Sequence, residues 1–333
     1  MKQMRCRCGQ VVYFANNTCV RCTRMLVFDP VALDMTSEPE VGSGLPACRN
    51  RTTAVRCNWA PRADSDDGWC LSCATSHTIP SLSKPENHER WRKLELAKRR
   101  LVYDLLRLGL PVDPANLRFE FKEDRRTNPD VSEQHVYTGH AQGVITINAA
   151  EADEVFREEM RQAMNEPWRT LLGHLRHESG HYYFYLVVDD ANRAEARALF
   201  GDETRDYDTA LGQYYRNGPA PNWTETHISA YATSHPSEDW AECWAHYLHI
   251  TDGLETARAN GLLPTDTSGD WDREVAAWIE GSVKLNEITR SLGVDDAYPF
   301  VLNAPVRQKL AFIRRRLEAA RRRPPAGAAA GVR

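Results

Sequence analysis

The chain has 333 residues, 42% of them hydrophobic and 26% charged, and its formal net charge is −4. This length suits a main domain with a smaller one, and the near balance of charge gives no global electrostatic case for binding nucleic acid or membranes. The first residues lead into cysteines instead of an apolar signal segment, and no stretch approaches about 20 apolar residues. We therefore expect a cytoplasmic protein.

Cysteines dominate residues 1–80, which hold eight of the nine in the chain. The first four form C-x-C and C-x2-C pairs, and the next four are two separated cysteines followed by C-x2-C. Such spacing is typical of four-cysteine zinc sites in a reducing compartment, with a disulfide framework as the alternative. We predict a small β-rich zinc-ribbon module with two structural zinc ions, which would supply much of its folding free energy. The ligand sets are Cys6, Cys8, Cys19 and Cys22, then Cys48, Cys57, Cys70 and Cys73, although pairing across the sets stays open.

The zinc-ribbon module also suggests a partner. Seven of its arginines make nucleic acid conceivable, namely Arg5, Arg7, Arg21, Arg24, Arg49, Arg51 and Arg56. Three aspartates between residues 64 and 67 dilute this charge. We favour a module that docks a protein or selects the substrate.

The second predicted domain covers residues 84–322. It opens with a helix from residue 84 to about residue 108, where apolar side chains recur on one face until Gly109 and Pro111 stop it. Residues 143–148 follow as an apolar, β-branched run that predicts a strand. This strand is either an edge that an extended peptide substrate joins or an interior strand with no substrate role.

The sequence His177-Glu178-Ser179-Gly180-His181 is the strongest chemical signal in the chain. Around it, Pro167 suits a first-turn position and apolar residues recur at helical spacing, so we expect a helix. On a helix the two histidines share one face and can reach one zinc ion, and Glu178 lies close enough to act on a bound water. The small residues 179 and 180 would let another helix approach closely.

A third ligand is expected on a downstream helix. Glu238 and Glu242 share one face there, behind Ser234 and Pro236. We favour Glu238, but Glu242 could be the ligand or a carboxylate that orients a liganding imidazole. A histidine six residues beyond His181 is lacking, because residue 187 is valine, which excludes the metzincin pattern. Weaker alternatives are Glu195 and Glu203, in a segment that indicates a solvated helix.

The remaining chain predicts further helices. The helix that carries Glu238 should end near Gly253, and two more should cover residues 271–292 and 305–322. Residues 323–333 are rich in alanine, glycine and proline, and we expect them to be disordered.

The segment Y-A-T-S-H-P-S-E-D-W-A-E, residues 231–242, resembles the third-ligand segment of the anthrax lethal factor protease. In both, a tyrosine precedes the ligand glutamate by seven residues. The resemblance implies Glu238 as the third zinc ligand, Tyr231 as a transition-state hydrogen-bond donor and Glu242 as a supporting carboxylate. These are roles of the gluzincin type.

Nearly the whole chain resembles a bacterial family of zinc-binding metallopeptidases that begin with zinc-ribbon cysteines. The cues are R-H-E-S-G-H-Y-Y, S-E-D-W-A-E and L-N-E-I-T-R-S-L-G-V-D-D-A-Y-P-F. We expect an α+β protein with a mainly helical zincin-like domain, and a peptidase in which Glu178 is the general base for a zinc-activated water. The alternative is a zinc-ribbon module that binds protein or nucleic acid beside a latent or inactive peptidase domain.

Overall fold

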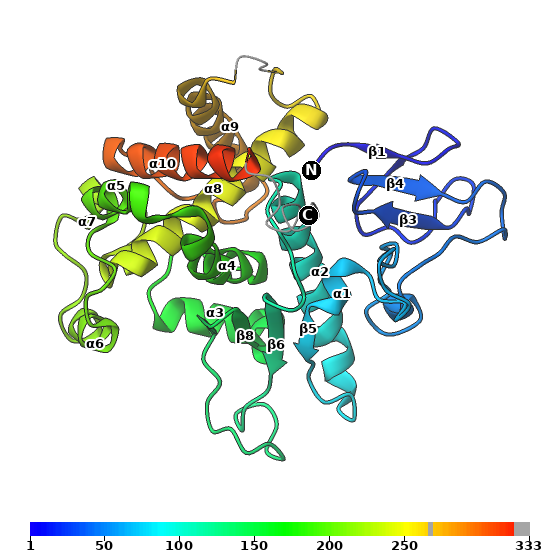
Figure 1. The fold of residues 1–333 in the computed structure, drawn as a ribbon, viewed down its shortest axis with the longest axis horizontal. Helices are drawn as coiled ribbons and strands as arrows, with labels where there is room; N and C mark the ends of the chain where they lie inside the picture. Colours follow the sequence, from blue (N-terminus) through cyan, green and yellow to red (C-terminus); the bar gives the residue numbers. More distant parts are fainter. Residues whose placement is uncertain (266–268, 323–333) are drawn as a thin grey trace, which may run out of the picture. The chain divides into compact units, whose positions relative to one another are not determined.

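The structure is a computed structural model that describes residues 1–265 and 269–322 (Figure 1). Its residues form two compact units. Unit 1 holds residues 1–106, 112–178 and the described part of 252–267, and unit 2 holds residues 107–111, 179–251 and the described part of 268–333. The tail predicted over residues 323–333 lies outside the described residues.

The cysteine-rich part of unit 1 is built from short hairpins. Gly9, with φ +84°, closes the first, and its N–H donates to the carbonyl of Cys6 at 2.8 Å. The strands and short helices are β1 (Met4–Arg5), β2 (Val11–Val12), β3 (Leu26–Asp29), β4 (Asp34–Ser37), η1 (Arg49–Arg51) and α1 (Leu71–Ala74). β1 pairs with β2 and β3 pairs with β4, both antiparallel.

An aromatic cluster gives the cysteine-rich part an apolar core, which the sequence did not lead us to expect. The ring of Phe28 lies 4.8 Å from that of Trp59 and 5.2 Å from that of Phe14, and all three side chains are buried. Tyr103 of α2 (Pro85–Arg107) joins the cluster, with its ring 5.7 Å from Phe14. Metal ions are therefore not the sole source of stability here.

A four-stranded sheet, in the order β5-β6-β8-β7, forms the rest of the core of unit 1 (Figure 1). Its strands are β5 (Ser76–Thr78), β6 (Arg118–Lys122), β7 (Gly139–Ala141) and β8 (Val144–Asn148), followed by η2 (Ala149–Ala152) and α3 (Glu154–Ala163). Phe119 lies opposite Ile145 and Phe121 opposite Ile147, and all four side chains are buried. The predicted strand at residues 143–148 is thus an interior strand, because β6 and β7 pair with its two sides. The edge-strand alternative for it is wrong.

Helices make up unit 2 and the connection to it. They are α4 (Leu171–Val187), α5 (Asp190–Phe200), α6 (Tyr207–Asn217), α7 (Trp223–Thr226), η3 (Tyr231–Thr233), α8 (Pro236–Ala259), α9 (Trp271–Ser291) and α10 (Ala304–Arg321). The helices predicted at 84–108, 271–292 and 305–322 are confirmed within a residue or two. A mainly helical α+β fold with small sheets and a zinc-ribbon region is confirmed.

Two helix boundaries differ from the prediction, and a capping interaction explains each. α4 begins at Leu171, not at Pro167, because the Thr170 hydroxyl accepts the N–H of Gly173 at 2.9 Å. α8 passes through Gly253 and ends at Ala259. There Gly261 has φ +72°, and the N–H of Leu262 donates to the carbonyl of Ala257 at 2.8 Å, a Schellman motif.

Candidate metal centre

The motif His177–His181 lies in the middle of α4. The two histidines are one helical turn apart on a single helix, so the helix itself sets their relative positions. His177 and Glu178 are buried, at 9% and 7% exposure, and the His181 side chain is 17% exposed. Local sequence therefore suffices to bring the two imidazoles to one face of α4, with Glu178 next to His177 along the helix.

α8 packs against α4 at the small residues of the motif. The indole of Trp244 donates to the Ser179 hydroxyl at 3.0 Å, and the indole of Trp240 donates to the carbonyl of Gly180 at 2.9 Å. A Cβ at Gly180 would lie 3.0 Å from the Cα of Ala241. The close helix approach expected from residues 179 and 180 is thus present, and it brings the first turn of α8 to the histidines.

Glu238 occupies this first turn and is 1% exposed. Its Oε1 lies 3.4 Å from Nε2 of His181, and one ligand atom each of His177, His181 and Glu238 lies within 4.8 Å of the others. Ligands at about 2.0–2.1 Å from a tetrahedral zinc ion are about 3.3 Å apart, so the separation between Glu238 and His181 fits the ion. Two imidazoles and a carboxylate are also the donor set of catalytic zinc sites.

Tyr207, which the sequence analysis did not single out, reaches the same carboxylate. It is the first residue of α6, and its hydroxyl donates to Oε1 of Glu238 at 2.8 Å. Tyr231 lies in η3, with its ring 6.0 Å from that of Tyr214. No local pattern distinguishes Tyr207 from the other tyrosines of the chain, because its contact with Glu238 spans 31 residues.

The other carboxylates considered as ligands, Glu195, Glu203 and Glu242, do not belong to the group of three ligand atoms. Glu203 accepts a bidentate pair of hydrogen bonds from Arg197, at 2.9 and 3.0 Å, which lowers the pKa of this carboxyl to about 2. Glu195 pairs with Arg315 at 2.5 Å on α10. Glu242 is half-buried one turn after Glu238 on α8, and its charge helps to raise the pKa of Asp239.

Asp239 and Lys309 form a buried ion pair beside the first turn of α8. Their side chains are 1% and 5% exposed, and Nζ lies 2.6 Å from Oδ2. Burial raises the pKa of Asp239 to about 6, although Lys309 acts in the opposite direction. The pair joins α10 to α8, the helix that carries Glu238. Lys309 also donates to the carbonyl of Thr226 in α7 at 3.0 Å.

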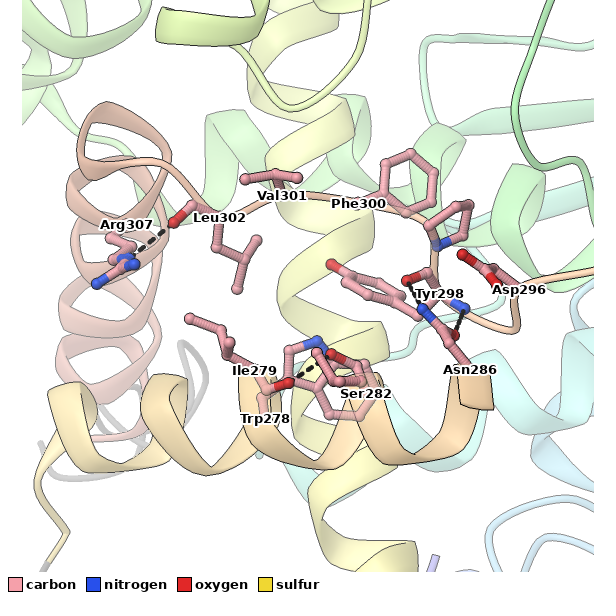
Figure 2. Close-up of a pocket in the computed structure, with 12 residues that line it drawn as sticks. Trp278, Ile279, Ser282, Asn286, Asp296, Tyr298, Phe300, Val301, Leu302 and Arg307 are labelled. Atoms are coloured by element: carbon pink, nitrogen blue, oxygen red, sulfur yellow. Dashed lines mark hydrogen bonds between the residues drawn. The ribbon is translucent and has the colours of Figure 1, made fainter. Parts of the chain in front are cut away.

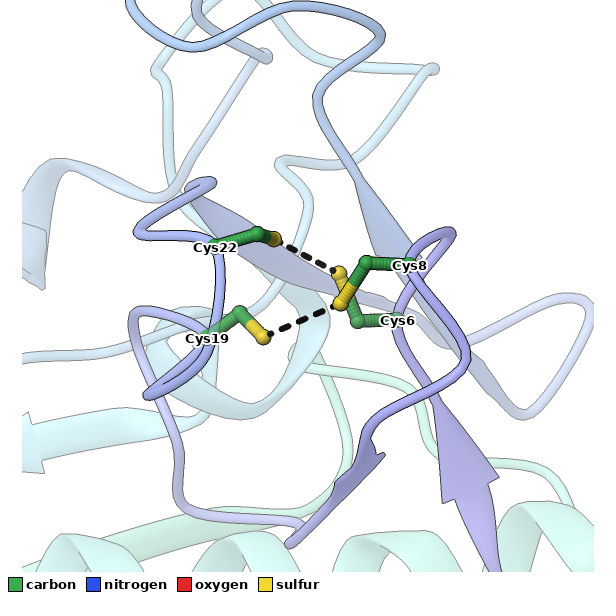
Figure 3. A group of neighbouring side chains, drawn as sticks. All are labelled: Cys6, Cys8, Cys19 and Cys22. Carbon is green, nitrogen blue, oxygen red and sulfur yellow. Dashed lines mark hydrogen bonds between the residues drawn. The ribbon is translucent and has the colours of Figure 1, made fainter.

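The eight N-terminal cysteines come together as the two predicted sets of four. In Figure 3, the thiols of Cys6 and Cys8 face those of Cys22 and Cys19, and the sulfur atoms are 3.5 Å and 3.7 Å apart. Tetrahedral ligands at about 2.3 Å from zinc are about 3.8 Å apart, so these distances fit the ion. All nine cysteines of the chain are free thiols, which contradicts the disulfide alternative.

The second set of cysteines is buried, and the sulfur atoms of Cys48 and Cys73 accept hydrogen bonds from N–H groups. Cys57 and Cys70 have sulfur atoms 3.7 Å apart, and Cys48 Sγ accepts the N–H of Cys70 at 3.4 Å. The Asn50 amide donates to Cys73 Sγ at 3.3 Å. Donors of this kind favour thiolate, the form that binds metal.

Several arginines of the zinc-ribbon region are engaged inside it. Arg51 donates to the carbonyls of Leu26 and Asn17, at 3.0 and 2.8 Å. Arg5 donates to the carbonyl of Gly9 at 3.1 Å. These guanidinium groups stabilise the turns of the module, which weakens the case for a nucleic-acid surface made by them.

A pocket of about 330 Å³ lies in unit 2, between α9 and the segment that leads to α10 (Figure 2). Asn286 holds this segment in place, because its side-chain amide bonds both the N–H and the carbonyl of Tyr298. Trp278 and Phe300 contribute apolar walls. The residues that line it include neither His181 nor Glu238.

Comparison with known proteins agrees with this geometry. A family model described as "Putative zinc-binding metallo-peptidase" matches residues 87–316, and a zinc-ribbon model matches residues 3–84. Uncharacterized proteins of Mycobacterium bovis and Mycobacterium tuberculosis are 40% identical over 332 residues, which cover 94% of this chain and 94% of each relative. No solved structure gives a significant match. In the described residues, 1–265 and 269–322, no helix is long and apolar enough to span a membrane.

Proposed function

The chain belongs to the family of zinc-binding metallo-peptidases, and we propose that it is a zinc-dependent peptidase of the gluzincin type. The proposal assigns the catalytic ion to His177, His181 and Glu238. The observation that carries it is the meeting of their ligand atoms within 4.8 Å, with Glu178 next to His177 in the sequence of α4. A purely structural zinc site more often has a fourth protein ligand and needs no base next to its ligands.

The chemistry follows from the groups around the site. A zinc ion held there would supply Lewis-acid chemistry, lowering the pKa of water and polarising a carbonyl. Glu178 would accept the proton of the attacking water and then deliver it to the leaving amine, a role typically worth about 10²–10⁴-fold in rate. Tyr231 would donate a hydrogen bond to the oxyanion, and Glu242 would support a liganding imidazole. The resemblance of residues 231–242 to the third-ligand segment of the lethal factor protease supports the assignments of Tyr231 and Glu242.

The proposal extends to the rest of the chain. The two sets of four cysteines would hold two structural ions in a module over residues 1–80, and residues 84–322 would be the peptidase domain. A peptide or protein is the substrate, and the zinc-ribbon module docks a protein partner or selects the substrate. Eight cysteines arranged as thiolate ligands support a reducing compartment, hence the cytoplasm.

Zinc content per chain, measured by elemental mass spectrometry together with cleavage of casein and a peptide library, tests the proposal. Wild type should hold three ions, one for each ligand group, and should cleave. Glu238→Ala should lose one ion, whereas Glu178→Gln should keep all three and lose cleavage. Unchanged zinc in Glu238→Ala would contradict the ligand set. Three ions without cleavage in wild type would favour the latent or binding alternative.

A further inference from the structure

We infer that Tyr207 is a positioning residue of the metal centre, which orients the carboxylate of Glu238 toward the ion. Its hydroxyl donates to Oε1 at 2.8 Å, and this same oxygen faces Nε2 of His181 at 3.4 Å. The Tyr207 phenol thus donates a hydrogen bond to the Glu238 oxygen that faces His181. The inference rests on the proposed function, because it takes Glu238 as a ligand.

The position of Tyr207 is determined by the start of α6. Asp206 caps this helix, with its side chain accepting the N–H of Thr209 at 2.8 Å. Next to it, the carbonyl of Arg205 lies 3.1 Å from Nε2 of His235. Tyr207 therefore projects from a helix end that Asp206 caps and that His235 holds through the carbonyl of Arg205.

His235 connects this helix end to the helix that carries the ligand. It is 2% exposed, and its Nδ1 accepts the N–H of Ser237 at 3.1 Å, so Nε2 carries the proton that it donates to Arg205. The ring of Tyr207 packs edge-on against this imidazole, with centroids 5.1 Å apart. One buried histidine thus fixes the phenol and the first turn of α8 together, and Glu238 lies three residues after it.

The chemical need for such a group follows from the carboxylate itself. A glutamate that binds metal through one oxygen can still rotate about its terminal torsion, which is broad. Glu238 is 1% exposed, so few waters can fix its orientation in place of the phenol. Hydrogen bonds from neighbouring groups to liganding carboxylates set their orientation, and their loss typically costs about 10–100-fold in metal affinity or activity.

The experiment uses the full chain and Zn²⁺ alone. Zinc retained per chain is measured against free zinc set by a chelating buffer, for wild type, Tyr207→Phe and Tyr185→Phe. Tyr185 is the matched control, because it lies on α4 and is 70% exposed. We expect Tyr207→Phe to raise the free zinc at half-occupancy of one ion by about 10–100-fold, with the other ions unchanged. Tyr185→Phe should titrate as wild type.

A spectroscopic readout separates positioning from a general loss of stability. With Co²⁺ replacing zinc, the visible bands of the site that Glu238→Ala abolishes should shift in Tyr207→Phe and stay unchanged in Tyr185→Phe. Asp206→Ala, which removes the helix cap but keeps the phenol, should weaken the same ion to a smaller extent. Wild-type zinc affinity and Co²⁺ bands in both Tyr207→Phe and Asp206→Ala would overturn the inference. An ion that survives Glu238→Ala would instead overturn the proposed function.

Discussion

Gly180 and Ala241 lie so close together that a Cβ on the glycine would stand 3.0 Å from the Cα of the alanine. Trp244 adds two further contacts at 3.1 Å to that position. The neighbours are backbone and the base of a bulky buried ring, so they cannot move away without disturbing the packing around them. This contact between α4 and α8 is what allows Glu238 to reach His181.

Gly180→Ala should therefore destabilise the fold. Overpacking typically lowers stability by about 1–3 kcal/mol, whereas the better helix propensity of alanine raises it by only about 1 kcal/mol. We expect a lower free energy of unfolding in urea and weaker retention of the zinc ion assigned to His177, His181 and Glu238. Gly139→Ala is the control, because a Cβ there meets nothing within 4 Å. Equal stability of the two variants would show that the helices tolerate a wider separation.

Lys309→Met should destabilise the protein strongly, because it leaves Asp239 buried without its cation. Removing one partner of a buried ion pair typically costs about 3–5 kcal/mol. Burial already raises the pKa of Asp239 from 3.8 to about 6, so the folded state holds this proton more tightly than the unfolded state does. The resulting stability is complete below about pH 4 and is lost as pH rises through about 6. Losing Lys309 raises this pKa further, so the loss of stability in Lys309→Met should grow with pH.

Urea unfolding of Lys309→Met at several pH values measures this effect. The double variant with Asp239→Asn is the control, and it should recover most of the loss because no buried charge remains. A penalty that is the same with and without Asp239→Asn would show that Lys309 acts through packing instead.

Glu203→Gln should lower stability at neutral pH without removing zinc. Arg197 lowers the pKa of Glu203 from 4.5 to about 2, so the stabilisation is present above about pH 4.5 and is lost as pH falls through about 2. We expect a cost of about 1–2 kcal/mol at pH 7, reduced by solvent screening because Arg197 is 41% exposed. Glu195→Gln, at a more exposed pair, should cost less than about 1 kcal/mol. Loss of a zinc ion in Glu203→Gln would instead indicate that Glu203 is a zinc ligand.

Cys70→Ser should release one zinc ion and loosen the second cysteine set. Cys70 is fully buried among three other thiols, and a structural zinc site contributes its binding free energy to folding. Limited proteolysis should then cut within residues 48–73 faster than in wild type. Cys243→Ala is the matched control, since this buried cysteine belongs to neither set, and it should keep the full zinc content. Unchanged zinc in Cys70→Ser would exclude a four-cysteine site.

Sequence alone determined the parts of this protein that depend on short spacing. The cysteine pairs predicted two sets of four, and H-E-x-x-H within a run of helical spacing predicted two imidazoles on one face. The cysteine pairs and the two imidazoles follow from local geometry, since knuckle turns and the 3.6-residue period place neighbouring ligands without any distant contact. The same periodicity located α2, α9 and α10, while a cap at Thr170 and an αL glycine at residue 261 moved two helix ends.

Tertiary structure decided everything that depends on which segments meet. The sequence favoured Glu238 over Glu195, Glu203 and Glu242 without excluding them, and the close packing of α8 on Gly180 is what brings Glu238 to His181. Strand order made residues 144–148 interior, because the more distant strand β6 pairs with the side of β8 that the neighbouring strand β7 leaves open. Tyr207 reaches Glu238 through the packing of two helix starts on His235. Such contacts arise from the burial and shape of whole elements, which residue spacing does not encode.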